Sequence, residues 1–117
     1  MMARLITGAQ RAQLLANGAT FDIDEAYDPL PVVKLFTPDA AATWLLTHID
    51  PAWPDLAFGL CDLGVGCPEI GSISLSEIAA LRGRFGLPVE RDRHFVARKP
   101  LSAYSEDVRR AGAIITG

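Results

Sequence analysis

A pair of short apolar segments, separated by a glycine-rich turn, constrains the fold of this sequence more than any other feature. Residues 56–63 are apolar in both alternating positions, which is typical of a central strand buried on both faces. Residues 64–68 include two glycines and a proline and predict a turn, and residues 69–75 alternate between polar and apolar side chains. The two segments therefore predict a β-hairpin within a sheet that is at least partly antiparallel.

Two further segments carry helix signals. Thr7 is a suitable N-cap for a helix over residues 4–17, and the pair Asn17-Gly18 favours its end. The run Thr37-Pro38-Asp39 combines a hydroxyl N-cap, a first-turn proline and an acid at the positive end of the helix dipole. Apolar residues then recur at helical spacing, so we expect a helix over residues 37–48.

The rest of the chain carries shorter signals. Residues 21–31 form an acidic, proline-containing loop, and β-branched and aromatic residues predict a strand over 32–36. Ser74 to Glu77 has the form of a capping box that begins a helix ending at Gly83. We further expect an edge strand over 91–97, a helix over 103–111 and a loose tail over 112–117.

Length and composition place these elements in one domain. The chain has 117 residues, of which 50% are hydrophobic and 21% charged, enough for one packed core. We predict a single α+β domain over residues 1–117, with a small, partly antiparallel sheet of three to four strands and helices packed on it. No apolar run reaches the roughly 20 residues of a membrane span, and the apolar part of the N-terminus is short for a signal peptide. We therefore expect a cytoplasmic protein.

Few residues could carry catalysis or bind a metal. Cys61 and Cys67 are the only cysteines, and His48 and His94 the only histidines. A zinc site takes about four such ligands, commonly in closely spaced pairs, and the sequence has no such pair of histidines or cysteines. Nucleophilic catalysis would need a cysteine, a histidine and an acid such as Asp62, and no motif orders them. We expect no catalytic residues, no metal and no cofactor; an enzyme or zinc protein built on Cys61, Asp62, Cys67 and His94 is the alternative.

The glycines of the predicted turn do not match the glycine motifs that bind cofactors. Gly64 and Gly66 lead into a strand, whereas the glycines of a dinucleotide fingerprint open a helix. No Gly-Lys-Ser or Gly-Lys-Thr follows them, which excludes a P-loop. We interpret both as turn glycines that supply a positive φ.

Positive charge is concentrated in one segment of an otherwise acidic chain. The net charge is −3, which argues against a protein that coats nucleic acid without selectivity. Residues 82–99 nevertheless hold six basic residues against only Glu90 and Asp92, and these are Arg82, Arg84, Arg91, Arg93, Arg98 and Lys99. We predict that this segment is the binding surface, with Trp53 as a further exposed aromatic candidate. The alternative is a solvated segment with internal ion pairs.

Six segments of the sequence together form one recognisable pattern. They are Val33 to Asp39, Ala42 to Leu46, Ala57 to Gly64, Gly66 to Gly71, Ser74 to Glu77 and Gly86 to Asp92. This pattern resembles one bacterial family, a domain of unknown function carried on plasmids and integrative conjugative elements. The resemblance spans residues 5–112, and Ser72 stands where the pattern has an aromatic residue.

The resemblance implies a biological context and no catalytic or ligand residues. Accessory proteins of mobile elements often blunt host defence, and such an inhibitor needs a stable small fold and an occluding surface. We therefore expect a non-enzymatic interaction protein of a mobile genetic element, an anti-CRISPR or anti-restriction inhibitor that binds a host protein or nucleoprotein complex. The alternative is a nucleic-acid-associated factor for conjugation or plasmid maintenance that uses residues 82–99.

Overall fold

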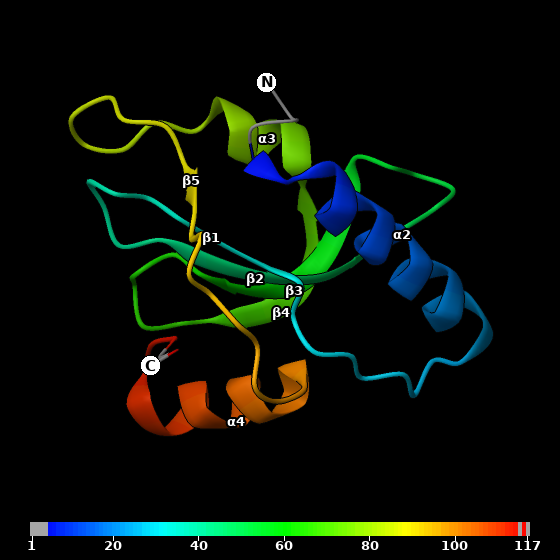
Figure 1. The fold of residues 1–117 in the computed structure, drawn as a ribbon. Helices are drawn as coiled ribbons and strands as arrows, with labels where there is room; N and C mark the ends of the chain where they lie inside the picture. The colour runs from blue at the N-terminus through cyan, green and yellow to red at the C-terminus, as the bar shows by residue number, and fades with distance from the viewer. Residues whose placement is uncertain (1–4, 115, 117) are drawn as a thin grey trace.

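A five-stranded antiparallel sheet with helices on both faces forms the domain (Figure 1). The computed structural model describes residues 5–114 and 116. The strands lie in the order β4-β3-β2-β1-β5. Along the chain, the elements of the described residues are α2 (Gly8–Ile23), β1 (Val33–Phe36), β2 (Thr43–Ile49), β3 (Leu56–Asp62), β4 (Glu69–Ser74), α3 (Leu75–Ala80), β5 (Glu90–Arg91) and α4 (Leu101–Ala111).

The helices divide the core into two parts. Helices α2 and α3 lie on one face of the sheet and α4 lies on the other (Figure 1). The core on the first face includes Leu14 of α2, Trp44 and Leu46 of β2, and Ile78 of α3. The core under α4 is smaller and consists of Leu45, Leu60, Leu101, Tyr104 and Val108. Because β2 and β3 contribute side chains to the packing on both faces, the centre of the sheet is covered by helices on both sides.

The predicted hairpin and fold class are confirmed. Strands β3 and β4 pair antiparallel from Leu56 opposite Ser74 to Cys61 opposite Glu69. Gly64 and Gly66 in the connecting turn have φ values of 81° and 83°, the left-handed region that glycine adopts without strain. The domain is α+β, with five strands where three to four were predicted.

The predicted helix over residues 37–48 is wrong, and this error accounts for the additional strand. Residues 43–49 form β2, between β1 and β3. Its residues from Trp44 to Ile49 are all buried, so burial does not alternate along the strand, and the spacing of its apolar residues also fits one face of a helix. Thr37 caps no helix: its hydroxyl accepts the N–H of Ala42 at 2.9 Å and closes a turn.

The predicted end of the first helix at Asn17-Gly18 is also wrong. Thr7 is the N-cap, with a capping box shared with Gln10, but α2 continues to Ile23. A Cβ atom at Gly18 would lie 1.9 Å from the carbonyl oxygen of Ile49. This glycine therefore permits close approach of α2 to β2, and it does not end the helix.

The remaining elements differ mainly in their bounds. Ser74 caps α3 as predicted, and the helix ends at Ala80. The predicted edge strand shortens to β5, Glu90–Arg91, which pairs with β1. Helix α4 begins at Leu101, two residues before the predicted start at residue 103, and ends at Ala111 as predicted.

The described part of the predicted loose tail contacts the sheet. Ile114 donates its N–H to Asp62 at 3.1 Å, and Thr116 Oγ1 accepts from the Lys34 ammonium at 2.6 Å. Residues 115 and 117 lie outside the described residues. Within residues 5–114 and 116, no helix has the length and apolar character needed to cross a membrane.

Candidate interaction surface

The predicted basic segment forms an extended arm along one edge of the sheet. We call residues 81–100 the arginine arm. It leaves α3, pairs with β1 over the two residues of β5, and continues to the start of α4 (Figure 1). Beyond β5, Asp92 donates its N–H to the carbonyl of Lys34 at 2.9 Å. The arm therefore rests on β1 through few backbone contacts, which leaves most of its side chains exposed.

A carboxylate from a distant turn fixes the first loop of the arm. Asp39 Oδ2 accepts the N–H groups of Phe85 at 2.7 Å and Leu87 at 3.2 Å. Gly83 packs directly on this carboxylate, since a Cβ there would lie 1.5 Å from Asp39 Oδ1. Gly86, with φ of 82°, supplies the tight turn. The loop over residues 83–87 is therefore held in one conformation, and its exposed side chains are presented on a fixed backbone.

Asp39 holds the candidate surface in place, and its local sequence pattern predicted a different role. Its predicted place was the first turn of a helix, where an acid needs no distant partner. In the structure it accepts hydrogen bonds from residues 46 and 48 positions away. No local sequence pattern signals a contact at that separation.

Three arginines of the arm have no partner for their side chains among the described residues. Arg84, Arg93 and Arg98 are exposed, and their guanidinium groups make no hydrogen bond or ion pair within residues 5–114 and 116. The nearby carboxylate of Asp92 pairs instead with Lys34, at 3.6 Å. The positive charge of these three side chains is therefore not neutralised within the described part of the chain.

The other basic residues of the arm make contacts within the protein. Arg82 Nη1 donates to the carbonyls of Ala79 at 3.1 Å and Leu81 at 2.7 Å, and so satisfies acceptors at the end of α3. Lys99 pairs with Asp107 and lies over the ring of Tyr104, 4.8 Å from its centroid. Arg91 lies half-buried in β5. These residues contribute to the fold as well as to the charge of the surface.

Large apolar side chains are exposed beside the unpaired arginines. Phe85, which precedes β5 in the chain, is 78% exposed, and Val96, which follows β5, is 72% exposed. Exposed apolar groups next to arginine are typical of protein interfaces, where arginine and aromatic residues are enriched. The arm therefore carries both the charge and the apolar area that a protein partner could bury.

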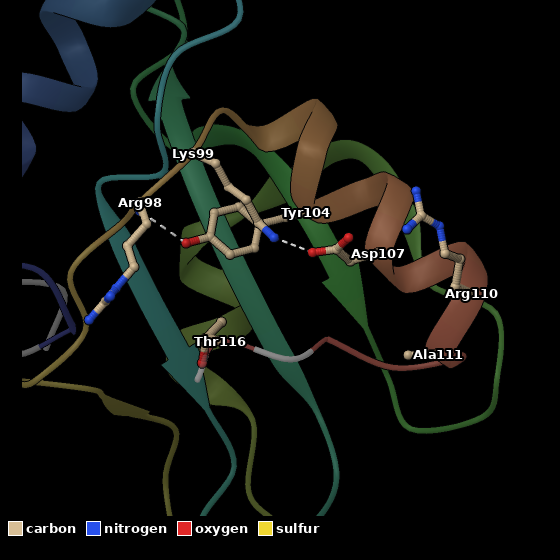
Figure 2. Close-up of a pocket in the computed structure, with 7 residues that line it drawn as sticks. All are labelled: Arg98, Lys99, Tyr104, Asp107, Arg110, Ala111 and Thr116. Carbon is tan, nitrogen blue, oxygen red and sulfur yellow. Dashed lines mark hydrogen bonds and ion pairs between the residues drawn. The ribbon is translucent and has the colours of Figure 1, made fainter.

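A hollow of about 520 Å³ lies where the arm meets α4, and it contains few free charges (Figure 2). Lys99 and Asp107 point toward each other across the ring of Tyr104, while the Arg98 and Arg110 guanidinium groups point away from it (Figure 2). The Tyr104 hydroxyl accepts the N–H of Arg98 at 3.1 Å. The cations of this hollow do not converge on one point, so its geometry favours a structural contact between arm and helix.

Trp53 is exposed, but it lies elsewhere on the molecule. It is 67% exposed in the turn that joins β2 to β3. This turn follows β2, whereas the turn holding Asp39 precedes it, so the two lie at opposite ends of the sheet. Trp53 is therefore separate from the fixed loop that displays Arg84 and Phe85.

The residues of the catalytic or metal alternative have separate structural roles. Burial raises the pKa of the Cys61 thiol, and Cys67 lies exposed in the turn. The carboxylate of Asp62 accepts the N–H groups of Gly64 and Ile114. In the part of the chain that the structure describes, no three histidine, cysteine or acidic side chains group closely enough to hold a metal ion.

His48 lies in the core. Its ring stacks with those of Phe21 and Phe58, with centroid distances of 4.6 Å and 4.8 Å, and these two rings also stack with each other at 6.0 Å. Its Nδ1 lies 3.0 Å from the hydroxyl of Thr47. Burial lowers the pKa of His48, against the opposing effect of the Asp22 and Asp50 carboxylates. These contacts make His48 a packing residue.

A comparison with protein families identifies the domain. The family model described as "Protein of unknown function (DUF2958)" matches residues 5–115, so the chain belongs to this family. No curated protein matches the chain, and no solved structure matches it.

Proposed function

We propose that this member of the DUF2958 family is a non-enzymatic interaction protein that binds a protein complex through the arginine arm. The observation that carries the proposal is the set of exposed arginines, Arg84, Arg93 and Arg98, without ion-pair partners among the described residues. They occur in a chain whose net charge is −3, so they oppose the overall sign of the molecule. Arginine suits such a role because its planar guanidinium binds carboxylates in two-point contacts and stacks on aromatic rings.

The fixed loop supports binding to a protein in particular. Asp39 holds the backbone of Phe85 and Leu87, so little conformational entropy is lost when a partner covers this loop. Phe85 would supply apolar area at the centre of a contact, and Arg84 beside it would supply charge. A surface that bound nucleic acid through phosphates alone would have no use for this exposed apolar area.

We further propose that the partner is a host defence complex, and that the protein acts in the cytoplasm as an anti-CRISPR or anti-restriction inhibitor encoded by a mobile element. The support is the resemblance of the sequence to a family carried on plasmids and integrative conjugative elements. An inhibitor of this kind occludes its target by binding, which requires a rigid small fold and a complementary surface. A role in conjugation or plasmid maintenance through nucleic acid is the alternative that the experiment must separate.

Affinity capture with matched charge variants tests the proposal. The tagged chain, the variant Arg84→Glu/Arg93→Glu and the control Arg11→Glu/Arg109→Glu would be incubated with a bacterial lysate, with and without nuclease. Both variants change the net charge equally, but only the first alters the arm. We expect the same proteins on the wild type and the control, with or without nuclease, and their loss from the arm variant. Equal capture by all three chains, or capture that nuclease abolishes, would contradict protein binding through the arm.

A further inference from the structure

A second hollow brings three arginines of the arm together. It measures about 350 Å³ and lies between the end of α3 and β5. Arg82, Arg91 and Arg93 line it from three positions, after α3, within β5 and after β5. Among the described residues that line the hollow, Glu90 is the only acidic one, so their formal charge is +2. The other lining residues are the apolar Leu5, Ala79, Pro88 and Val89.

Arg82 is held in place at this hollow and still has donors to offer. Its Nη1 is engaged by the carbonyls of Ala79 and Leu81, which fixes the guanidinium plane at the end of α3. The pairing of Arg82 with Pro88 across the base of the fixed loop also holds its backbone. A guanidinium carries five N–H groups, so an anion in the hollow can be bound by those that do not face the helix.

Arg93 supplies a second cation to this hollow. It is exposed, and its side chain has no hydrogen bond or ion pair among the residues that the structure describes. An anion between Arg82 and Arg93 would gain charge-assisted hydrogen bonds from both sides.

We infer that this hollow binds the carboxylate of an acidic side chain, Asp or Glu, on the protein partner; this rests on the proposed docking function and names the chemistry of the partner. The apolar residues of the lining would contact the methylene groups of such a side chain. A carboxylate is the anion that a protein partner offers, and the exposed Phe85 and Val96 of the arm favour a protein over a nucleic acid. The hollow would thereby select an acidic position on the partner, while the fixed loop supplies the apolar contact.

A titration of the purified full chain with small probes tests this inference separately from capture of a partner. The probes are an acetylated, amidated tetraglutamate peptide, the corresponding tetraglutamine peptide, inorganic phosphate and a short single-stranded DNA. Binding is followed through the backbone amide NMR signals of residues around the hollow, such as Ala79 and Val89. Arg93→Gln removes the exposed cation of the hollow without disturbing the cap that Arg82 makes on α3. Arg109→Gln is the matched control, since it removes one exposed arginine outside the arm.

We expect tetraglutamate to shift the signals around the hollow and tetraglutamine to leave them unchanged. Arg93→Gln should weaken tetraglutamate binding at least fivefold, and Arg109→Gln less than twofold. Equal weakening by both variants would show that tetraglutamate responds only to the net charge of the protein, and would contradict a binding site at the hollow. An absence of shifts at the hollow would overturn it too, and tighter binding of phosphate or DNA would overturn the carboxylate assignment. Failure of the capture experiment alone would leave this result intact, because no partner enters the titration.

Discussion

The carboxylate of Asp39 accepts a hydrogen bond of 2.7 Å from the backbone N–H of Phe85, 46 residues further along the chain. This contact joins the turn between β1 and β2 to the first loop of the arginine arm. It is charge-assisted, and such bonds are about twice as strong as neutral ones. The arm is attached to β1 through the two residues of β5 and through the N–H of Asp92 on the Lys34 carbonyl, and the pairing of Arg82 with Pro88 only closes the loop on itself. The position of Arg84 and Phe85 therefore depends on Asp39.

Replacement of Gly83 by alanine should destabilise the protein through Asp39. The new Cβ would lie 1.5 Å from Asp39 Oδ1, so the carboxylate must move and lose its bonds to the loop. We expect a loss of about 1–3 kcal/mol in the free energy of unfolding, measured by urea titration. Gly71→Ala is the control for glycine replacement, because a Cβ there meets nothing within 4 Å.

A double-mutant cycle attributes this cost to the carboxylate. In an Asp39→Ala background the clash is absent, so Gly83→Ala should cost less than about 0.5 kcal/mol. The coupling energy between the two positions should then be about 1 kcal/mol or more. Additive effects of the two substitutions would show that Gly83 is required for another reason.

Gly18→Ala should be one of the most destabilising alanine substitutions in α2. The Cβ would lie 1.9 Å from the Ile49 carbonyl oxygen, and the backbone of β2 cannot move without disturbing the centre of the sheet. We expect a loss of about 2–4 kcal/mol, above the usual range for exposed helix positions. Gly8→Ala in the same helix meets nothing within 4 Å, and it should be neutral or stabilising by up to about 1 kcal/mol. Equal effects at the two positions would contradict the close approach of α2 to β2.

The stability of the protein should fall as the pH drops below about 6.5, the ordinary pKa of histidine. Burial lowers the pKa of His48, so the unfolded chain binds a proton at a pH where the folded chain still holds the neutral imidazole. Proton binding to the unfolded state then reduces the free energy of unfolding. Urea titrations at pH 7.5 and 5.5 would measure the difference.

His48→Phe keeps an aromatic ring in contact with Phe21 and Phe58 and removes the titrating group. The variant should lose most of the difference in stability between the two pH values. Carboxylates titrate below this interval, near pH 4, so their contribution to the difference is small. A variant with the same pH dependence as the wild type would place the titrating group elsewhere.

The two thiols should react at different rates. Cys67 is exposed, whereas Cys61 is partly buried and burial raises the pKa of its thiol, which lowers the fraction of reactive thiolate. A thiol reagent at pH 7.5 should modify one cysteine quickly, and Cys67→Ser should remove that fast phase. Elemental analysis should find no stoichiometric zinc in the purified protein. About one zinc per chain, lost in Cys67→Ser, would contradict this assignment of the cysteines.

The sequence predicted the parts of the fold that local patterns specify. The β3–β4 hairpin follows from apolar alternation and turn glycines, and the caps at Thr7 and Ser74 follow from side chains that bind nearby N–H groups. Each of these signals acts within a few residues of the chain. Such local signals therefore predict the same structure whatever the tertiary contacts of the segment are.

The errors arose where a distant contact decides the structure. Gly18 looks like a helix end, but it is required by the carbonyl of Ile49 on another element. Residues 44–49 are buried without alternation because both faces of β2 are covered, and the spacing of their apolar side chains fits helix and strand equally. For the candidate surface, the sequence located the arginines, but not Asp39, which fixes their loop, nor the hollow that gathers Arg82, Arg91 and Arg93.

The affinity of a captured partner for the Arg84→Glu/Arg93→Glu variant tests the central claim most directly. Both side chains are exposed, so circular dichroism and the melting temperature should match those of the wild type. We expect the dissociation constant, measured by calorimetric titration, to rise tenfold or more, about 1.4 kcal/mol, because the variant replaces attraction with repulsion. The control Arg11→Glu/Arg109→Glu should bind within about twofold of the wild type. An unchanged affinity in a variant with an unchanged melt would contradict docking through the arm, and would direct attention to Trp53 and the acidic residues 22–28.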